Sequence, residues 1–262
     1  MSVSVRSVGH GPDLVLLHGW AMHSGVFAEL LPSLTLHYRV HCIDLPGHGR
    51  SLLGDHHHTL EQWAAAIAPH VPQGAIVLGW SLGSLLAVKL ARQQALRALI
   101  LVSTTPRFVA AHDWPQGMAE DVFAQFFSRL QQNMNSTVEN FLRLQVRGDS
   151  HAADTFAALQ SSLLQHPADP LALQIGLEIL RDADERPALM NIEIPTLVVA
   201  GEYDRIAHPS ASRFSAASLP NAQFSLIKRA GHAPFISHRQ EFLHELARFL
   251  GDLDARQAAA NV

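Results

Sequence analysis

Three residues whose side chains suit nucleophilic acyl transfer stand far apart in the sequence, each just past an apolar run. Ser81 lies between Gly79 and Gly83 in GWSLG, a pattern typical of a strand-to-helix turn that exposes a nucleophile. A serine hydroxyl is a poor nucleophile unless a base takes its proton. His232 follows the run QFSLIK, and Asp204 follows IPTLVVA. We therefore expect Ser81 to be the nucleophile, His232 its general base and Asp204 the carboxylate that orients the imidazole.

Simpler interpretations of these residues also exist. Asp204 can cap the helix that follows it, and His232 can be a turn residue ahead of Pro234. Glu202 is a competing acid in the same segment, GEYD. The order serine, acid, histidine favours the catalytic set, as does the position of all three after strands, because the carboxyl ends of parallel strands share one edge of a sheet.

Acyl transfer through a serine also needs donors for the negatively charged oxygen of the tetrahedral intermediate. We expect the amide of Leu82, directly after the nucleophile, to be one donor. The amide of Trp20, in the loop LHGW after an early strand, is the expected second donor. Gly19 lets the backbone approach closely at this point, and the Trp20 indole can form a wall of the pocket.

Apolar runs that alternate with amphipathic segments predict the elements that hold these residues. Strands are expected at 13–18, 39–43, 75–78, 97–102, 194–200 and 223–228. Helices are expected at 24–36, with Ser24 as the cap, and at 60–71, 82–94, 209–219 and 238–250. The alternation implies crossover connections, and hence an α/β fold with a mostly parallel sheet and helices on both faces.

The alternation stops between residues 106 and 190, where the sequence shows no convincing strand. Amphipathic helices are expected there near 118–132, 136–147, 151–165 and 170–181. We therefore predict an α/β core, residues 1–105 and 191–262, interrupted by a helical lid, residues 106–190.

Composition argues against several classes of partner. The 262 residues carry a net charge of −4, so neither nucleic acid nor an anionic membrane is expected. No apolar run has the length of a membrane-spanning helix or of a signal peptide. The single cysteine, Cys42, can form no internal disulfide, which favours the cytoplasm. The run His56-His57-His58 suggests a metal site, but three adjacent side chains do not readily face one ion, and we expect a solvated loop.

Five segments together resemble the α/β-hydrolase superfamily along the whole chain. They are HGW at 18–20, DLPGHGRS at 44–51, GWSLG at 79–83, GEYD at 201–204 and GHAPF at 231–235. A finer resemblance, to the pimeloyl-[acyl-carrier protein] methyl ester esterases of biotin synthesis, is carried by four further segments. These are LLHGWAMHSGVF, GWSLGSLLA, FLRLQ (141–145) and GLEILRDAD (176–184).

The finer resemblance implies hydrolysis of a methyl ester at the far end of a pimeloyl chain held on an acyl-carrier protein. The products are the free carboxylate and methanol, and no metal or organic cofactor is required. We expect a monomer that also accepts small-molecule esters. By match to the family's motif, the substrate site would be lined by Trp20, Ser81, Leu82, Phe141, Leu142, Arg143, Leu144, Gln145 and His232.

Apolar residues of the predicted lid have two possible roles. They can bury the acyl methylenes, at about 0.8 kcal/mol per CH₂ group, or they can pack the lid onto the core. The residues concerned are Phe123, Phe126, Phe127, Leu130, Phe141 and Leu144.

The carrier protein is acidic, and the resemblance implies that basic residues of the lid meet it. Between residues 106 and 190 there are six arginines, no lysine and eleven acidic residues, a net charge of −5. Arg129, Arg143 and Arg147 can still form one basic patch, because Arg143 and Arg147 are one helical turn apart. The alternative is that these arginines are scattered surface charges.

Three other functions remain open. The first is a broad-specificity short-chain carboxylesterase without a carrier partner. The second is a receptor or scaffold that keeps the fold without turnover, which the complete set of Ser81, Asp204 and His232 disfavours. The third is a perhydrolase or a C–C bond hydrolase, since both kinds of enzyme share this core.

Overall fold

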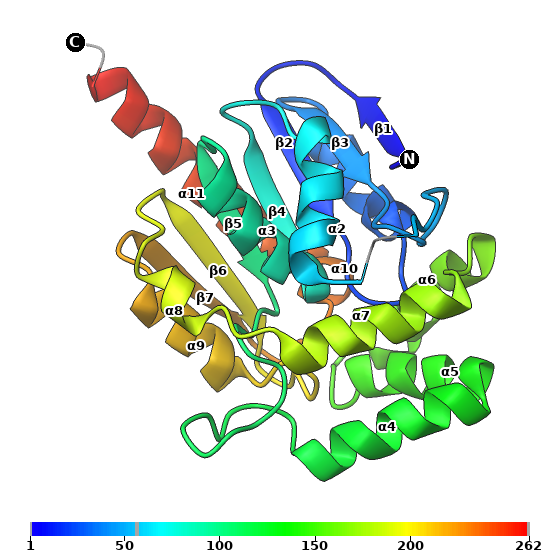
Figure 1. Ribbon diagram of the computed structural model, residues 1–262. Coiled ribbons are helices and arrows are strands. Elements are labelled where there is room, and N and C mark those ends of the chain that lie inside the picture. Colours follow the sequence, from blue (N-terminus) through cyan, green and yellow to red (C-terminus); the bar gives the residue numbers. More distant parts are fainter. Residues whose placement is uncertain (1, 56–57, 261–262) are drawn as a thin grey trace.

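The computed structural model of the protein describes residues 2–55 and 58–260. Its centre is a seven-stranded sheet in the order β1-β3-β2-β4-β5-β6-β7 (Figure 1). The strands are β1 (Val5–Val8), β2 (Asp13–Leu17), β3 (Arg39–Ile43), β4 (Ile76–Trp80), β5 (Ala98–Val102), β6 (Thr196–Gly201) and β7 (Ala222–Ile227). Each strand from β2 to β7 pairs in parallel with its neighbours among them, which confirms the predicted mostly parallel sheet.

The edge strand β1 was not predicted from the sequence. It pairs antiparallel with β3, with Val5 opposite Ile43 and Val8 opposite Val40. Its four residues alternate only weakly between apolar and polar, and none of them is fully buried. A short strand at an exposed edge therefore leaves little periodic signal in the sequence.

Successive residues of the inner strands enter two separate hydrophobic cores. In β4, Val77 packs on the face covered by Trp63 of α2 (Leu60–Ile67) and Leu86 of α3 (Leu82–Gln93). Leu78 packs on the opposite face with Phe242 of α11 (Arg239–Ala260). This alternation follows from the two-residue period of a strand, and each large apolar side chain that it buries contributes roughly 1.5–3 kcal/mol. The sheet is thus covered on both faces, as predicted.

The remaining helices of the core are short. They are η1 (Ser24–Leu30), α1 (Leu31–Leu34), η2 (Ala68–His70), α9 (Pro209–Ser218) and α10 (Pro234–Ser237). The expected cap at Ser24 was wrong: the cap of η1 is His23, whose Nδ1 accepts from the amide of Gly25. The Ser24 amide donates instead to Asp44, which ties this turn to the loop after β3.

Between β5 and β6 the chain forms five helices, of which α4 to α7 lie beyond the carboxyl edge of the sheet (Figure 1). They are α4 (Glu120–Gln132), α5 (Met134–Gln145), α6 (Ala152–Gln165), α7 (Pro170–Asp182) and the short α8 (Arg186–Leu189). We call residues 106–190 the insertion. Four of these helices lie within a few residues of the ranges expected from the sequence.

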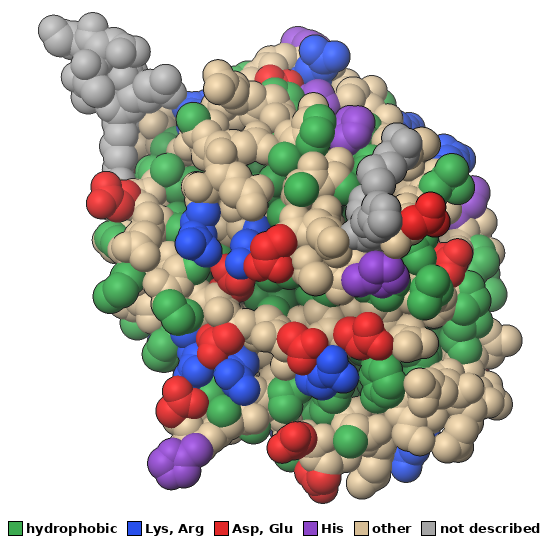
Figure 2. All heavy atoms as spheres, viewed as in Figure 1, with side chains coloured by type: hydrophobic (Ala, Val, Ile, Leu, Met, Phe, Trp, Pro, Cys, Tyr) green, Lys and Arg blue, Asp and Glu red, His purple; other side chains and the backbone are tan. Residues whose placement is uncertain are grey.

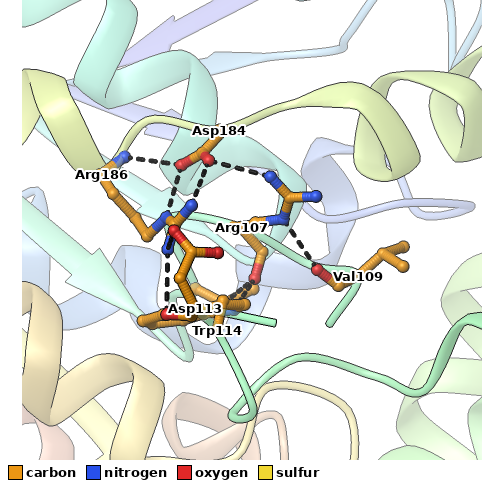
Figure 3. A network of polar contacts seen from close by, with 7 residues as sticks. Arg107, Val109, Asp113, Trp114, Asp184 and Arg186 are labelled. Atoms are coloured by element: carbon orange, nitrogen blue, oxygen red, sulfur yellow. Dashed lines mark hydrogen bonds and ion pairs between the residues drawn. The ribbon is translucent and has the colours of Figure 1, made fainter. Parts of the chain in front are cut away.

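The two ends of the insertion are tied together by a polar network (Figure 3). Arg107 donates to Asp184 at 3.0 Å, and Arg186 donates to the same carboxylate at 2.6 and 2.8 Å. The amide of Glu185 donates to the carbonyl of Pro106 at 2.7 Å. Hydrogen bonds from Arg186, and then from Arg107, hold the pKa of Asp184 below its usual range. The chain therefore enters and leaves the insertion at one place, where the Arg107–Asp184–Arg186 network joins its two ends. We call this network the base of the insertion.

Within the described ranges, no helix combines the length and apolar character that crossing a membrane requires. His56 and His57 of the histidine run lie outside the described residues, so the expected solvated loop is not tested there. His58 is exposed, and its Nε2 lies 3.1 Å from the carbonyl of Asp55.

Candidate active site

Ser81 occupies a strained turn between β4 and α3. Its φ of 55° and ψ of −119° lie outside the regions that a serine normally adopts. The amide of Ser81 donates to Val102 of β5 at 3.0 Å, and its carbonyl accepts from the Ser84 amide at 2.8 Å and from the Ser84 hydroxyl at 2.6 Å. These bonds hold the residue in a conformation that costs of order 1–3 kcal/mol.

Gly79 and Gly83 make this turn possible because each has no side chain at a close backbone contact. A Cβ on Gly79 would lie 2.3 Å from the carbonyl oxygen of Gly83. A Cβ on Gly83 would lie 2.4 Å from the carbonyl oxygen of Leu17 in β2. Both distances are far inside van der Waals contact, so helix α3 can approach the sheet only with glycine at these two positions.

Asp204 and His232 meet at the same edge of the sheet. Asp204 lies three residues after β6, His232 lies five residues after β7, and His232 Nδ1 lies 2.8 Å from Asp204 Oδ2. Both side chains are almost fully buried. The second oxygen of Asp204 accepts from the amides of Ile206 and Ala207 at 2.8 and 2.9 Å. Asp204 thus orients the imidazole and caps the following turn at once.

Glu202, the competing acid, is placed elsewhere. Its carboxylate accepts from the amide of Arg229 at 2.9 Å, an exposed contact between the loops after β6 and β7. The structure therefore pairs His232 with Asp204.

Three contacts hold the backbone around His232. Its amide donates to the carbonyl of Gln145 at the end of α5 at 2.8 Å, and its carbonyl accepts from the indole of Trp80 at 2.8 Å. The preceding amide, of Gly231, donates to the buried carboxylate of Asp149 at 2.6 Å. His232 Nε2 is buried and makes no hydrogen bond with any described residue, so it is available to a proton donor in the site.

Two contacts with the backbone around His232, from the Gln145 carbonyl and the Asp149 carboxylate, were not predicted from the sequence. Gln145 was expected to line the substrate site with its side chain, and Asp149 was assigned no role. The Gln145 amide group is buried without a hydrogen-bond partner among the described residues, while its carbonyl holds His232. A backbone acceptor has no residue-type signature, so no sequence pattern could identify this contact.

The two expected oxyanion donors lie on either side of the nucleophile. Leu82 is the first residue of α3, and the first amides of a helix have no acceptor within it. Trp20 follows Gly19, whose Cβ position would lie 3.2 Å from the Cβ of Ser81. The loop that carries the Trp20 amide therefore runs directly beside the nucleophile.

His18 fixes the start of this loop. It belongs to the motif LHGW, but no role was predicted for it from the sequence. Its Nδ1 lies 2.8 Å from the carbonyl of Gly19, and its Nε2 accepts from the amide of Leu45 at 2.9 Å. Together these contacts require the neutral ring with its proton on Nδ1. Burial, and then the neighbouring His48, lowers the pKa of His18 to about 3, which agrees with the neutral form.

Aromatic side chains of the insertion cover the Trp20 indole. Phe141 of α5 meets it edge-on at 4.9 Å between ring centroids, and Phe126 of α4 meets it at 5.6 Å. The indole Nε1 donates to the carbonyl of Leu173 in α7 at 2.8 Å. Three helices of the insertion thus converge on Trp20.

The other residues expected to line the substrate site are not all brought together. Leu142 is fully buried and faces an apolar cavity, and Leu144 faces a second cavity. Arg143 is exposed, pairs with Glu139 at 2.6 Å and lies over the ring of Phe156. Arg143 lines neither cavity, because successive residues of a helix point to different sides.

The apolar cavity has a volume of about 410 Å³ and lies between Ala21, next to Trp20, and helices α5, α6 and α7. Its apolar lining includes Ala21, Val138, Leu142, Leu163 and Leu173. The second cavity, of about 550 Å³, reaches Asp204 from the other side of α5. Its lining includes Leu144, Arg147, Arg205 and His208, and we call it the Arg147–Arg205 cavity.

Several charged side chains elsewhere form ion pairs. Figure 2 shows acidic and basic side chains interspersed across one face, which agrees with ion pairs such as Lys89–Glu61 and Arg181–Asp182. Among the residues that the structure describes, no group of three or more His, Cys, Asp or Glu side chains is arranged to hold a metal ion.

Comparison with known proteins agrees with this geometry. A family model described as the alpha/beta hydrolase fold matches residues 12–239. The pimeloyl-[acyl-carrier protein] methyl ester esterase of Nitrosospira multiformis is 38% identical over 95% of this chain and 98% of its own length. The enzyme of the same name from Xanthomonas oryzae pv. oryzae is 42% identical over 94% of this chain and 98% of its own.

Among solved structures, an esterase from Exiguobacterium antarcticum superposes with a TM-score of 0.87 at 21% identity, over 95% of both chains. Its likeness concerns the fold, whereas the two closer relatives match in sequence from end to end. The chain therefore belongs to the alpha/beta hydrolase fold family and, within it, to the group of sequences that contains these methyl ester esterases.

Proposed function

We propose that this protein is a serine carboxylesterase that hydrolyses the methyl ester of pimeloyl-[acyl-carrier protein], yielding pimeloyl-carrier protein and methanol in biotin synthesis. The near full-length relatives of that name support the substrate. We place the reaction in the cytoplasm, where the lone thiol of Cys42 stays reduced.

One observation carries the chemistry: the buried contact between Asp204 and His232 at the sheet edge where Ser81 is held in its strained turn. A carboxylate that binds Nδ1 leaves Nε2 as the site that takes a proton. The buried, unbonded Nε2 of His232 fits that role.

The steps follow from these positions. Ser81 Oγ attacks the ester carbonyl carbon while His232 Nε2 takes its proton. The carbonyl oxygen becomes negative and is bound by the amides of Trp20 and Leu82. His232 then returns the proton to the departing methoxide, and methanol leaves. Water, activated by the same nitrogen, hydrolyses the acyl-Ser81 intermediate to the free acid.

The apolar cavity suits the pimeloyl chain. Its walls between α5, α6 and α7 are mainly apolar, and its volume falls within the range of small-molecule sites. Each methylene that leaves water there contributes about 0.8 kcal/mol. Leu142, one of the expected lining residues, contributes its side chain to this cavity.

The carrier protein is part of the proposal, and the structure changes which arginines we assign to it. Arg143 is paired with Glu139, and Arg107, Arg181 and Arg186 are also paired with acids. Arg129, the third arginine of the patch considered from the sequence, makes no ion pair with a described residue, but it is exposed on α4 and does not line the cavity that reaches Asp204. Arg147 makes no ion pair with a described residue and shares its cavity with Arg205, which is also unpaired. We therefore assign the anionic part of the carrier-borne substrate to the Arg147–Arg205 cavity, beside the catalytic acid.

The substrate is tested by comparing kcat/KM for pimeloyl-carrier methyl ester with that for a nitrophenyl ester of similar acyl length. A large preference for the carrier-borne ester supports the proposal. Equal rates on both would favour a broad-specificity carboxylesterase without a carrier partner. A serine-directed phosphonate should label Ser81, as detected by mass spectrometry, and an unlabelled Ser81 would favour a non-catalytic receptor.

The assignment of the arginines has its own test. Arg147→Glu and Arg205→Glu should each raise KM for the carrier-borne ester about tenfold, and leave the nitrophenyl ester unchanged within about twofold. Arg143→Glu is the matched control, because Arg143 lies on the same helix but is exposed and away from the cavity. If Arg143→Glu has the larger effect, the carrier docks on the outer face of α5 instead.

A further inference from the structure

We propose that helix α7 of the insertion positions the Trp20 oxyanion donor relative to that of Leu82, and that Gly176 is the residue that lets it do so. The inference rests on the proposed serine esterase chemistry but not on the identity of the ester. It makes the insertion a working part of the catalytic site rather than only a cover over it.

Gly176 is the point at which α7 touches the two donor residues. A Cβ built on Gly176 would lie 2.7 Å from Trp20 Cδ1, 3.2 Å from Trp20 Nε1 and 3.6 Å from Leu82 Cδ2. The first distance is too short for any carbon–carbon contact, so a side chain at this position would force one of the partners to move. Glycine therefore sets how closely α7 can approach Trp20, whereas the Leu82 distance is an ordinary van der Waals contact.

Trp20 has little freedom to give way. Its side chain is 2% exposed, Phe126 and Phe141 pack against it edge-on, and its Nε1 is bonded to the Leu173 carbonyl one turn before Gly176 in α7. The atom that meets the added Cβ is part of a rigid ring close to the backbone. A displacement of the ring is therefore passed to the Trp20 backbone, including its amide.

The loop that carries this amide is also conformationally restricted. Gly19 lies against Ser81, and Ala21 has a φ of 64°, in the left-handed region that a non-glycine residue seldom adopts. On the other side, Leu82 is fully buried at the start of α3. A shift imposed by α7 would thus change the distance between the two amides that must converge on one oxygen.

This placement predicts a specific kinetic signature. Oxyanion donors act mainly on the transition state, so their displacement lowers kcat and leaves KM nearly unchanged. Removal of one such donor typically lowers kcat by 10²–10³-fold, and a displaced donor should cost less. We expect Gly176→Ala to lower kcat by about 10–100-fold on a nitrophenyl ester.

The chain offers a matched control in Gly251 of α11. This glycine is also helical, and a Cβ built on it would meet no atom within 4 Å. Alanine is the better helix former at both positions, so neither substitution should weaken its helix through propensity. Gly251→Ala should leave kcat and KM unchanged. An equal loss in both variants would show a general effect of the substitution and overturn the proposal.

A double-mutant cycle separates positioning from a general loss of structure. In a Trp20→Ala background the obstructing ring is absent, so Gly176→Ala should lower kcat by less than about twofold further. A full additive loss in that background would overturn the inference. Binding of a trifluoromethyl ketone, which mimics the tetrahedral intermediate, should weaken in parallel with kcat, whereas binding of a ground-state ester analogue should not.

Two further variants separate a failure of the role of α7 from a failure of the proposed esterase site. If Gly176→Ala does not fold, Trp20→Phe removes the Nε1–Leu173 bond while keeping the backbone amide, and the same selective loss of kcat is expected. An unchanged kcat in that variant would contradict the proposal. If Ser81→Ala retains full activity, the proposed esterase site itself fails. If Ser81→Ala is inactive but Gly176→Ala is fully active, only the role of α7 fails.

Discussion

The core and the insertion both place residues at the candidate active site, but they do so by different means. The core fixes Ser81, Asp204 and His232 at the ends of parallel strands, and its glycines at 79 and 83 bring helix α3 against the sheet. The insertion acts through aromatic packing on Trp20, through the carbonyls of Leu173 and Gln145, and through the Asp149 carboxylate. Positions at strand ends follow from topology, whereas contacts of a helix depend on which way each of its faces is turned.

The strongest test of the core concerns the catalytic acid. Asp204→Asn should lower kcat by about 10⁴-fold, because an amide no longer stabilises the imidazolium and favours the wrong tautomer of His232. Glu202→Gln is the matched control, since Glu202 bonds only the Arg229 amide in an exposed contact. It should change kcat by less than about twofold. Steady-state kinetics on a nitrophenyl ester measures both.

A reversed outcome would break the comparison. If Glu202→Gln caused the large loss and Asp204→Asn did not, the strand-end argument would have selected the wrong acid. The hydrogen bonds of Asp204 to the amides of Ile206 and Ala207 would then have only a structural role.

The sequence predicted the strand ends of the core better than it predicted the helix faces of the insertion. Strand ends could be inferred from apolar runs, so the edge that carries Ser81, Asp204 and His232 was predictable, as were the helices of the insertion. The orientation of α5 was not. Arg143 and Arg147 are one turn apart, and the sequence left open whether they form one patch or are scattered surface charges. In the structure Arg143 pairs with Glu139, and Arg147 faces a cavity with Arg205. Helical periodicity gives relative positions but not which face meets the core.

Contacts made by the backbone or by a missing side chain were also out of reach. The Gln145 carbonyl that holds His232 leaves no trace in residue type. In the sequence, Gly176 was noted only as the first residue of GLEILRDAD, one of the segments that resemble the family. Its contact with Trp20 depends on how α7 crosses the loop that carries Trp20. Such contacts join segments more than 80 residues apart, and only the packed structure brings them together.

Acidification should lower the free energy of unfolding mainly through two buried histidines in loops of the core, and only weakly through the insertion. Burial lowers the pKa of His18 to about 3 and that of His48 to about 4. An ordinary histidine titrates near 6.5, so below that pH the unfolded chain takes up protons that the folded chain does not. The free energy of unfolding should therefore fall as the pH falls, by roughly 3–4 kcal/mol for the pair between pH 7 and pH 5.

Urea unfolding at the two pH values measures this loss. His48→Asn keeps a donor near the Pro46 carbonyl, which Nδ1 of His48 reaches at 2.9 Å, and it removes one titrating group. The variant should lose about half as much stability between pH 7 and pH 5. An unchanged loss would show that other groups cause the acid sensitivity.

The base of the insertion should show the smallest effect. Hydrogen bonds from Arg186 and Arg107 lower the pKa of Asp184, so its contribution is complete above the ordinary carboxyl pKa of about 4 and is lost as the pH falls through the lower folded value. Partly exposed pairs contribute about 1 kcal/mol or less. Asp184→Asn should therefore lower the free energy of unfolding by that amount at pH 7. Below the lowered pKa of Asp184 in the folded protein, the substitution should have almost no effect.

The same variant can show whether the base holds the insertion closed. Asp184 joins the end of the insertion to Arg107 at its start, whereas Asp182, two residues earlier, pairs among the described residues with its neighbour Arg181. Hydrogen exchange in residues 107–119, followed by mass spectrometry at pH 7, should therefore rise in Asp184→Asn and stay unchanged in Asp182→Asn. Equal exchange in both variants would mean that aromatic packing on Trp20, rather than the polar base, keeps the insertion in place over the core.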